Sequence, residues 1–378
     1  MLNRLSIVLM VIEETTTNNI DMKEMTPLER CQAVLSGKLP DYLPIIPQSF
    51  MYAVETAGFK ISDVNHSGRR MAECHLISQE KYGYDGCVID FDDASIAEAI
   101  GAKVIFRDDE PAIVDESVPL LQDLRQVYDM KVPDIYSAGR LNEWLEATRI
   151  LNEKIGDHVF IMGRADQGPF SIACLLRGTT QFMMDLMMED KKLIDDVLEY
   201  CRQVSLAFAK AQKDVGAHAT SIGDSLAGPN LISPQMYKEF AYEPEKKLTE
   251  EVQAYGIPFS IHICGDSTGI ISDMGHTGAR ILEVDWKLDM DYARKVTPKD
   301  TVLMGNVNPS DPLVFGSPQE VDEAVRQVVQ KTQGRNLFIS SGCAMGRNTP
   351  DANMKAFIAA GRKYGSYEEV MKLRESQK

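Results

Sequence analysis

The sequence of 378 residues predicts a (β/α)8 barrel of the TIM type. Eight short apolar, β-branched segments follow one another along the chain, and most of them end on Gly, Asp, Asn or Ser. From residue 218 on, they recur at intervals of roughly 20 to 40 residues with helical or polar segments between them, which is typical of parallel strands wound by helices. The alternative, an open doubly wound sheet, is disfavoured because no strand leads into a G-x-G-x-x-G loop.

The first part of the chain is expected to supply two of the barrel strands. Thr26 followed by Pro27 is a good helix start, with Thr as the N-cap and Pro in the first turn, and it opens an amphipathic helix over 26–36. Pro44 and Pro47 restrict how the first strand can pair. We expect that strand at 42–47, helices at 50–57 and 67–82, and the second strand at 87–91.

An insertion follows the second strand, because the chain leaves the strand–helix rhythm between residues 93 and 157. Two β-branched runs, at 103–107 and 112–114, flank an acidic turn and predict a β-hairpin. Residues 118–133 are expected to be irregular or to form short helices, and 141–156 to form a helix. The predicted fold is therefore a (β/α)8 barrel with a hairpin and helical insertion after its second strand.

Six more strands follow in order, each leading into a polar turn or a helix. The polar stretch 165–170 is expected to be the loop after the third strand, and the methionine-rich run at 183–188 is interpreted as helix core. We expect these strands at 159–164, 218–222, 259–264, 279–286, 301–308 and 337–341, and helices at 170–176, 179–188, 190–216 and from Ser233 through 240.

Charge and cysteine usage narrow the class of protein. The formal net charge of −16 and the pI near 4.9 argue against nucleic-acid binding, which needs a basic surface. The 7 cysteines are an odd number without a legible disulfide framework, so we expect a cytoplasmic protein. The apolar run at 6–12 is too short to span a membrane. We expect residues 1–21 to be a disordered extension and 22–378 to form a single catalytic domain.

A histidine and two cysteines stand out as candidate metal ligands. His262 and Cys264 are two residues apart in the fifth strand, so their side chains project from the same face. Cys343 comes just past the eighth strand, and the carboxyl ends of all barrel strands meet at one mouth. Three N and S ligands with a fourth position open are typical of catalytic Zn²⁺. The alternative is a core cysteine beside a histidine that bonds a backbone carbonyl.

Polar residues at other strand ends are expected around the same mouth. Asp224 and Asp285 end the fourth and sixth strands, and each is a candidate partner of a ligand or a displaceable fourth ligand. The alternative for each is a helix N-cap or a loop residue. Asn306 joins them as a candidate catalytic residue. Arg164 and Asn308 are candidates for cofactor binding, and an internal ion pair is the alternative for Arg164.

A metal held by two thiolates and one imidazole favours chemistry at sulfur. Two thiolate charges neutralise Zn²⁺, which makes the ion a modest Lewis acid toward water but a good partner for a substrate sulfur. A metal-bound thiol is deprotonated near neutral pH and stays nucleophilic. The ligand set therefore predicts alkyl transfer to a thiol rather than hydrolysis, for which His and carboxylate ligands are commoner.

Four segments share a pattern with a known family. They are the His-x-Cys strand end at 261–265, the Asn-Pro pair within 305–309, the Ser-Gly-Cys turn at 341–343 with 349–353 after it, and the segment 222–237. Together they resemble the uroporphyrinogen decarboxylase superfamily, and within it the cobalamin-dependent methyltransferases of the methylcobalamin:coenzyme M type. The resemblance covers roughly Thr26 to Tyr364.

The resemblance implies a TIM barrel, zinc on His262, Cys264 and Cys343, and a separate methylated corrinoid protein that docks at the barrel mouth. It leaves the substrate open, since members pass the corrinoid methyl group to a thiol or load it from methoxyl compounds or methylated amines. A decarboxylase fits less well, because 47–52 has no arginine to hold substrate carboxylates. A corrinoid- or tetrapyrrole-binding protein without turnover is a further alternative. We therefore expect a zinc-dependent methyltransferase acting between a corrinoid protein and a thiol.

Overall fold

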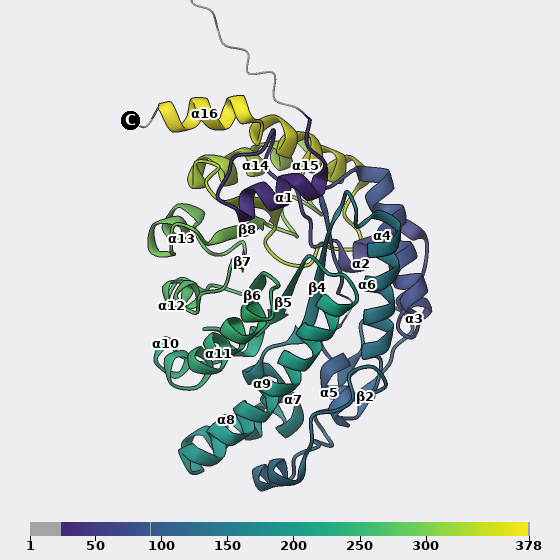
Figure 1. Cartoon of the computed structure of the whole chain (residues 1–378), viewed down its shortest axis with the longest axis vertical. Helices are drawn as coiled ribbons and strands as arrows, with labels where there is room; N and C mark the ends of the chain where they lie inside the picture. Colours follow the sequence, from purple (N-terminus) through teal and green to yellow (C-terminus); the bar gives the residue numbers. More distant parts are fainter. Residues whose placement is uncertain (1–23, 91, 377–378) are drawn as a thin grey trace, which may run out of the picture.

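The computed structural model describes residues 24–90 and 92–376, in which a parallel sheet curls into a barrel surrounded by helices (Figure 1). In this described part the sheet has 7 strands, and their order in space follows their order along the chain. The predicted (β/α)8 barrel is confirmed, whereas the predicted extension at 1–21 lies outside the described residues. The strands are β1 (Gly86–Val88), β4 (Phe160–Gln167), β5 (Ala219–Gly223), β6 (Phe259–Ile263), β7 (Ile281–Val284), β8 (Val302–Val307) and β9 (Leu337–Ser341).

Residues 42–47, predicted as the first strand, occupy the eighth position of the barrel without forming a regular strand. Ile45 makes an isolated bridge to Ile339 of β9. The Ile46 N–H donates to the Ile339 carbonyl at 2.8 Å, and on the other side the Asp85 N–H donates to the Ile45 carbonyl at 2.8 Å. The prediction of a strand is wrong because the two prolines of the segment have no N–H to continue a ladder. The segment still closes the barrel between β1 and β9.

Helices cover the outside of the barrel, and the ribbon shows them as an outer ring (Figure 1). The predicted N-cap is confirmed, because the Thr26 hydroxyl accepts the Glu29 N–H at 3.2 Å. No helix in the described ranges is long and apolar enough to cross a membrane. The helices are α1 (Pro27–Leu35), α2 (Phe50–Ala57), α3 (Ile61–Val64), α4 (Gly68–Tyr82), α5 (Ser95–Ile100), α6 (Leu141–Ile155), α7 (Pro169–Arg177), α8 (Thr179–Met188), α9 (Lys191–Asp214), α10 (Pro234–Met236), α11 (Tyr242–Ala254), α12 (Ile271–His276), α13 (Met290–Val296), α14 (Pro318–Thr332), α15 (Asp351–Tyr364) and α16 (Tyr367–Glu375), with short turns of other helix types at η1 (Leu124–Asp129), η2 (Ser225–Ala227) and η3 (Tyr237–Ala241).

The insertion after β1 contains the predicted hairpin. Its strands β2 (Val104–Ile105) and β3 (Ile113–Val114) pair antiparallel, which confirms that prediction. Arg347, in the loop after β9, forms ion pairs of 2.9 Å with Asp109 at the hairpin tip and of 2.9 Å with Glu55 of α2. The Asp109 pair ties the hairpin to the loop after β9, and the Glu55 pair ties the same arginine to α2.

Strand β4 runs farther than predicted. The stretch 165–170 was expected to be a polar loop, but β4 continues to Gln167, and Ala165, Asp166 and Gln167 are all buried. The ladder to β5 shifts register between Arg164 and Gln167 and then resumes, with Gln167 opposite Gly223. Polar side chains inside a barrel mouth do not show the apolar pattern of a strand, which is why the prediction failed. Arg164, predicted as the last residue of its strand, consequently lies in the middle of β4.

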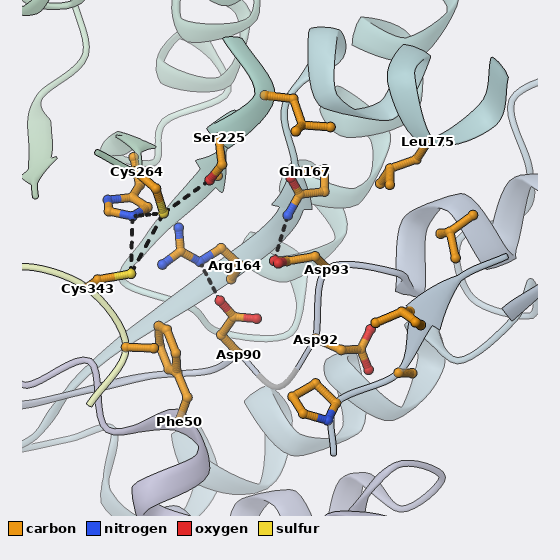
Figure 2. Close-up of a pocket in the computed structure, with 18 of the residues that line it drawn as sticks. Phe50, Asp90, Asp92, Asp93, Arg164, Gln167, Leu175, Ser225, Cys264 and Cys343 are labelled. Atoms are coloured by element: carbon orange, nitrogen blue, oxygen red, sulfur yellow. Dashed lines mark hydrogen bonds and ion pairs between the residues drawn. The ribbon is translucent and has the colours of Figure 1, made fainter. Parts of the chain in front are cut away.

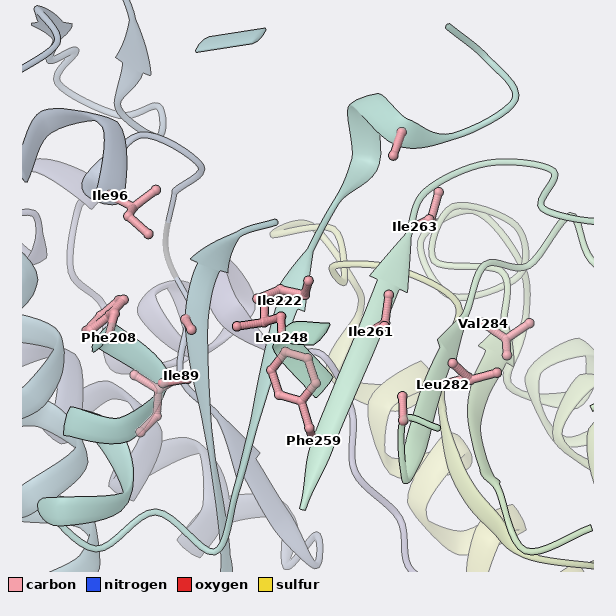
Figure 3. Packing of buried hydrophobic residues seen from close by; sticks show 14 of the residues in the cluster. Ile89, Ile96, Phe208, Ile222, Leu248, Phe259, Ile261, Ile263, Leu282 and Val284 are labelled. Atoms are coloured by element: carbon pink, nitrogen blue, oxygen red, sulfur yellow. The ribbon is translucent and has the colours of Figure 1, made fainter. Parts of the chain in front are cut away.

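The hydrophobic core has two layers, and β6 shows how they are separated. Phe259, Ile261 and Ile263 face outward and pack in the layer between sheet and helices, where Leu248 of α11 also lies (Figure 3). A second, smaller cluster contains residues of several strands, among them Phe160, Met162, Val302, Met304 and Phe338. The alternation of a strand therefore turns Ser260 and His262 toward the barrel interior.

The methionine-rich run on α8 is not helix core. Met184, Met187 and Met188 are 49%, 76% and 78% exposed, so this interpretation is wrong. α8 lies outside α7, and only one face of it packs inward, through Phe182 and Leu186.

Candidate metal centre

His262, Cys264 and Cys343 converge at the carboxyl-terminal end of the barrel. The His262 Nε2 lies 3.0 Å from the Cys264 Sγ and 3.9 Å from the Cys343 Sγ, and the two sulfurs are 3.7 Å apart (Figure 2). β6 supplies the histidine and ends just before Cys264, while the turn after β9 supplies Cys343. The structure thus brings together three residues that are up to 81 positions apart in the chain.

The imidazole of His262 is oriented by a backbone carbonyl. Its Nδ1 lies 3.1 Å from the Glu283 carbonyl oxygen of β7, and because a carbonyl can only accept, Nδ1 carries a hydrogen. The other ring nitrogen, Nε2, therefore faces both sulfurs, and loss of its proton leaves a lone pair there. This is the usual arrangement of a metal-ligating histidine, whose second nitrogen is fixed by a hydrogen bond.

The surroundings of the two cysteines favour a thiolate. The Cys343 S–H and then the His262 ring hold the pKa of Cys264 well below its usual range, against the effect of burial. The same hydrogen bond, together with burial, raises the pKa of Cys343. Burial on its own lowers the pKa of His262, but the neighbouring Cys264 thiolate raises it to about 9. The site stabilises negative charge on sulfur, which is a requirement for binding a dication.

The donor set fits zinc. The three ligand atoms all lie within 4.8 Å of one another, close enough to share one ion. Thiolates and imidazole are the donors that zinc selects, and three protein ligands leave a fourth position. All three residues line one cavity, so that position faces a space that a substrate can enter. Ser225, at the end of β5, also donates its hydroxyl to the Cys264 Sγ at 3.3 Å.

The cavity beside the cysteines has a volume of about 530 Å³, which suits a small molecule. One wall is apolar and is formed by the hairpin residues 111–114 together with Leu175 and Leu226. The polar part of the lining includes Gln48, Gln167 and several carboxylates. Strand ends form the metal side of the cavity, and the insertion after β1 forms much of the side opposite.

Arg164 lies in the middle of the cavity and is already paired. Its Nη2 is 2.9 Å from Glu283 and its Nε is 3.1 Å from Asp90, and the side chain is buried (Figure 2). Burial alone would lower the pKa of Arg164, but these carboxylates and Asp93 raise it. The internal ion pair, which was the alternative for this residue, is therefore present.

Carboxylates outnumber cationic side chains in the cavity lining. Asp90, Asp92, Asp93 and Glu116 all line it, against one arginine or lysine among the described lining residues. Burial, and to a smaller degree its acidic neighbours, raises the pKa of Asp90 to about 8 despite Arg164. Asp93 is open to the cavity, but the surrounding protein groups reduce its hydration, and this desolvation together with the Cys264 charge raises its pKa to about 6. The lining therefore has an excess of negative charge.

Two of the predicted residues support the turns that carry the ligands. Asp285 accepts the Gly265 N–H at 2.9 Å and the Lys287 N–H at 2.9 Å, so it joins the turn after Cys264 to the turn after β7. Asn306 donates its side-chain amide to the carbonyls of Asp285 at 3.0 Å and Leu288 at 2.7 Å. Neither residue lines the cavity. Their contacts position the Cys264 turn.

The other two predicted residues lie away from the cavity lining. Asp224 is fully buried, and its carboxylate accepts the N–H groups of Ser171 at 2.7 Å and Phe170 at 3.3 Å, which caps α7. At the start of η2, which follows its own strand, the Asp224 side chain makes no capping bond, so it serves α7 instead. Asn308 accepts the Ser310 N–H at 2.9 Å within its own turn.

Several cavity residues were not among the sequence candidates. Gln48 follows the irregular closing segment, and nothing in its sequence neighbourhood marks it. Asp93 and Ser225 do follow barrel strands, so their position at a carboxyl-terminal strand end was an available signal. The backbone carbonyl of Glu283 orients His262, and its side chain binds Arg164. Glu283 lies within β7, and no sequence pattern predicts either contact.

Comparisons with known proteins agree with this geometry. A family model described as uroporphyrinogen decarboxylase (URO-D) matches residues 26–364. The methylcobamide:CoM methyltransferase MtbA of Methanosarcina mazei is 26% identical over 348 residues, which are 91% of this chain and 99% of that protein. A uroporphyrinogen decarboxylase of Prochlorococcus marinus is 28% identical over 261 residues, 66% of this chain and 72% of that protein. The solved structure of a methyltransferase from Methanosarcina mazei matches with a TM-score of 0.82 and 25% identity, covering 90% of this chain and 99% of the other.

Proposed function

Because the chain belongs to the uroporphyrinogen decarboxylase family, we propose that it is a corrinoid-dependent methyltransferase that moves a methyl group between a corrinoid protein and a small thiol. The observation that carries the proposal is the meeting of one ring nitrogen and two sulfurs, within 4.8 Å of one another, at the end of a small cavity. The methylcobamide:CoM methyltransferases support it, since this chain matches nearly their full length. We infer that residues 22–378 act as one catalytic domain in the cytoplasm.

Zinc held by His262, Cys264 and Cys343 would supply a substrate thiolate that keeps its nucleophilicity near neutral pH. A carbon–sulfur bond then forms between the thiol sulfur and the methyl carbon, while the carbon–cobalt bond breaks and its electron pair stays on cobalt. The thiol proton is released to solvent. In-line attack requires the methyl carbon to approach the thiol sulfur with the cobalt on its far side, and we infer that the corrinoid protein brings it there through the barrel mouth.

The residues of the chain hold this arrangement in place. Glu283 fixes the His262 ring through its carbonyl, and Ser225 donates to Cys264. Asp285 and Asn306 hold the turn that follows Cys264. The apolar hairpin wall excludes water from one side of the cavity, which protects a thiolate from solvation.

A decarboxylase acting on uroporphyrinogen is disfavoured by the charge of the cavity. A tetrapyrrole substrate with several carboxylates would meet the carboxylates of Asp93 and Glu116, while Arg164 is already paired with Glu283 and Asp90. The segment 47–52 also contains no arginine. The alternative methyltransferase reaction loads the corrinoid protein from a methoxyl compound or a methylated amine. It would use the same cavity, with the methyl group moving from the small substrate to the corrinoid.

The test is to follow methylcobalamin spectroscopically with the purified full chain and a panel of thiols and methylated compounds. We expect demethylation of methylcobalamin that depends on a thiol and on zinc, and formation of the matching methyl thioether. Release of carbon dioxide from uroporphyrinogen, with no methyl transfer to or from any compound in the panel, would contradict the proposal. Cobalamin binding without turnover would instead favour a corrinoid-binding protein.

A further inference from the structure

Gln48 is a buried amide without a partner. Its side chain is 1% exposed, and neither its Oε1 nor its Nε2 has a hydrogen-bond partner within the described structure. Buried amides are almost always satisfied, because a lone one loses its bonds to water without replacement. Gln48 lines the cavity, so a polar group bound there can supply the missing partner. The amide offers both an acceptor and two donors.

The backbone of Gln48 is tied to the loop that carries Cys343. Its N–H donates to the Ser341 hydroxyl at 3.2 Å, and its carbonyl accepts the Met345 N–H at 2.9 Å. Ser341 and Met345 lie two residues on either side of Cys343. The unpaired amide therefore lies on the same side of the cavity as the metal centre, where it can reach the polar end of a short thiol whose sulfur is at the metal.

The charge around this part of the cavity is negative. Asp93 is exposed to the cavity, and its nearest polar partner is Gln167, whose Nε2 donates to it at 2.8 Å. Among the described residues, no arginine or lysine forms an ion pair with Asp93 within 4.0 Å, whereas Asp92 is paired to Arg140 at 2.7 Å. Figure 2 shows Asp93 beside Arg164, on the cavity side of the two sulfurs. An anionic group has no uncompensated positive charge to bind here, because Arg164 has two carboxylate partners.

We propose that the substrate of this cavity is a short thiol, or its methyl thioether, whose second polar group is cationic, with Gln48 bonding that group and Asp93 balancing its charge. The identification of the thiol class rests on the proposed methyl transfer, but the charge preference is a property of the cavity itself. It distinguishes this chain from relatives named for coenzyme M, a thiol that carries an anionic sulfonate. An uncharged hydroxyl in place of the cation is expected to bind with intermediate affinity.

The experiment compares three matched ligands by isothermal titration calorimetry with the full chain. They are methyl thioethers with a two-carbon arm that ends in an ammonium, a hydroxyl or a sulfonate group. We expect the ammonium compound to bind at least tenfold more tightly than the sulfonate, with the hydroxyl between them. Equal or tighter binding of the sulfonate overturns the proposal. Because no turnover is needed, this result stands even if every thiol fails as a methyl acceptor, an outcome that would sink only the proposed function.

Two variants test which residues cause the preference for the ammonium compound. Asp93→Asn should abolish the advantage of the ammonium over the hydroxyl compound, whereas Asp108→Asn, which removes the same charge from the exposed hairpin tip, should leave it unchanged. Gln48→Met keeps the length of the side chain and should weaken the ammonium and hydroxyl compounds several-fold. Thermal unfolding checks that each variant is folded. An unchanged preference in folded Asp93→Asn, or unchanged affinities in folded Gln48→Met, contradicts the assignment of that residue.

Discussion

The metal end of the cavity is carried by the ends of β6 and β9, whereas its opposite wall is carried by the hairpin β2–β3 and the loop after β1. At the metal end, buried hydrogen bonds to the backbone link neighbouring turns. For example, the Asp285 carboxylate accepts the Gly265 N–H. At the hairpin end, Arg347 forms an ion pair with the half-exposed Asp109 of the hairpin and a second with the half-exposed Glu55 of α2. We infer that the metal end is rigid and serves metal binding and chemistry. The hairpin end is more adaptable and determines which substrate binds.

Removing a ligand should have the largest effect. Cys343→Ala leaves two protein donors for zinc, and we expect zinc affinity to fall by more than about 100-fold, beyond the loss usual for an outer partner of a ligand. Methyl transfer should disappear with it. The matched control is Cys201→Ala, in α9, which removes a buried cysteine outside the cluster. Competition with a chromogenic zinc chelator measures the zinc affinity of both variants. Equal affinities would show that Cys343 is not a zinc ligand.

Gly342→Ala should disturb the metal end without removing a donor. A Cβ at this position would lie 2.4 Å from the backbone nitrogen of Trp286, so the turn carrying Cys343 has to move. We expect zinc affinity to fall by about 10- to 100-fold, as for other changes around ligands. Gly346→Ala, in the same loop, would bring its Cβ to 2.6 Å from a methyl group of the partly exposed Val314 and to no backbone atom nearer than 4.0 Å, so it should keep its zinc. Similar zinc affinities for the two variants would show that the metal end is not rigid.

Ser225→Ala should have a smaller effect on the same end. It deletes one hydrogen bond to the Cys264 sulfur, and a hydrogen bond to a charged group contributes about 1.5–3 kcal/mol. We expect zinc affinity to fall by roughly 10-fold, near the lower end of that range, because a water molecule can replace the hydroxyl at a cavity wall. The chelator competition above measures it, and Ser225→Thr, which keeps the hydroxyl, serves as control. A loss as large as that of Cys343→Ala would make Ser225 itself a ligand.

Arg347→Ala should act on the hairpin end alone. It removes two partly exposed ion pairs, each worth about 0.2–1 kcal/mol. We expect the KM for the thiol to rise a few-fold while zinc affinity stays the same, because the hairpin contributes no ligand. Steady-state kinetics at saturating zinc separates KM from kcat. A loss of zinc in this variant would show that the two ends are coupled, contrary to the comparison above.

The same division explains which parts the sequence alone could predict. His262 and Cys264 share a face because a strand alternates, and Cys343 follows a strand in a barrel whose strand ends meet; both are local patterns joined by one rule of the fold. The family resemblance is likewise confirmed by a match over residues 26–364. The positions of Gln48 and Asp93 in the cavity depend on how an irregular segment and an insertion pack. No short-range sequence periodicity predicts that packing. The end of β4 at 165–167 was predicted as a loop because a polar strand end has the pattern of a loop.

Zinc content and coordination of the purified chain test the central claim most directly. After dialysis against a weak chelator, X-ray absorption at the zinc edge should show one tightly bound zinc per chain with two sulfur neighbours and at least one nitrogen. One sulfur should be lost from that shell in Cys264→Ser and in Cys343→Ser. Wild-type protein that cannot hold zinc, or zinc whose sulfur shell is the same in both variants, would contradict a metal centre built from His262, Cys264 and Cys343.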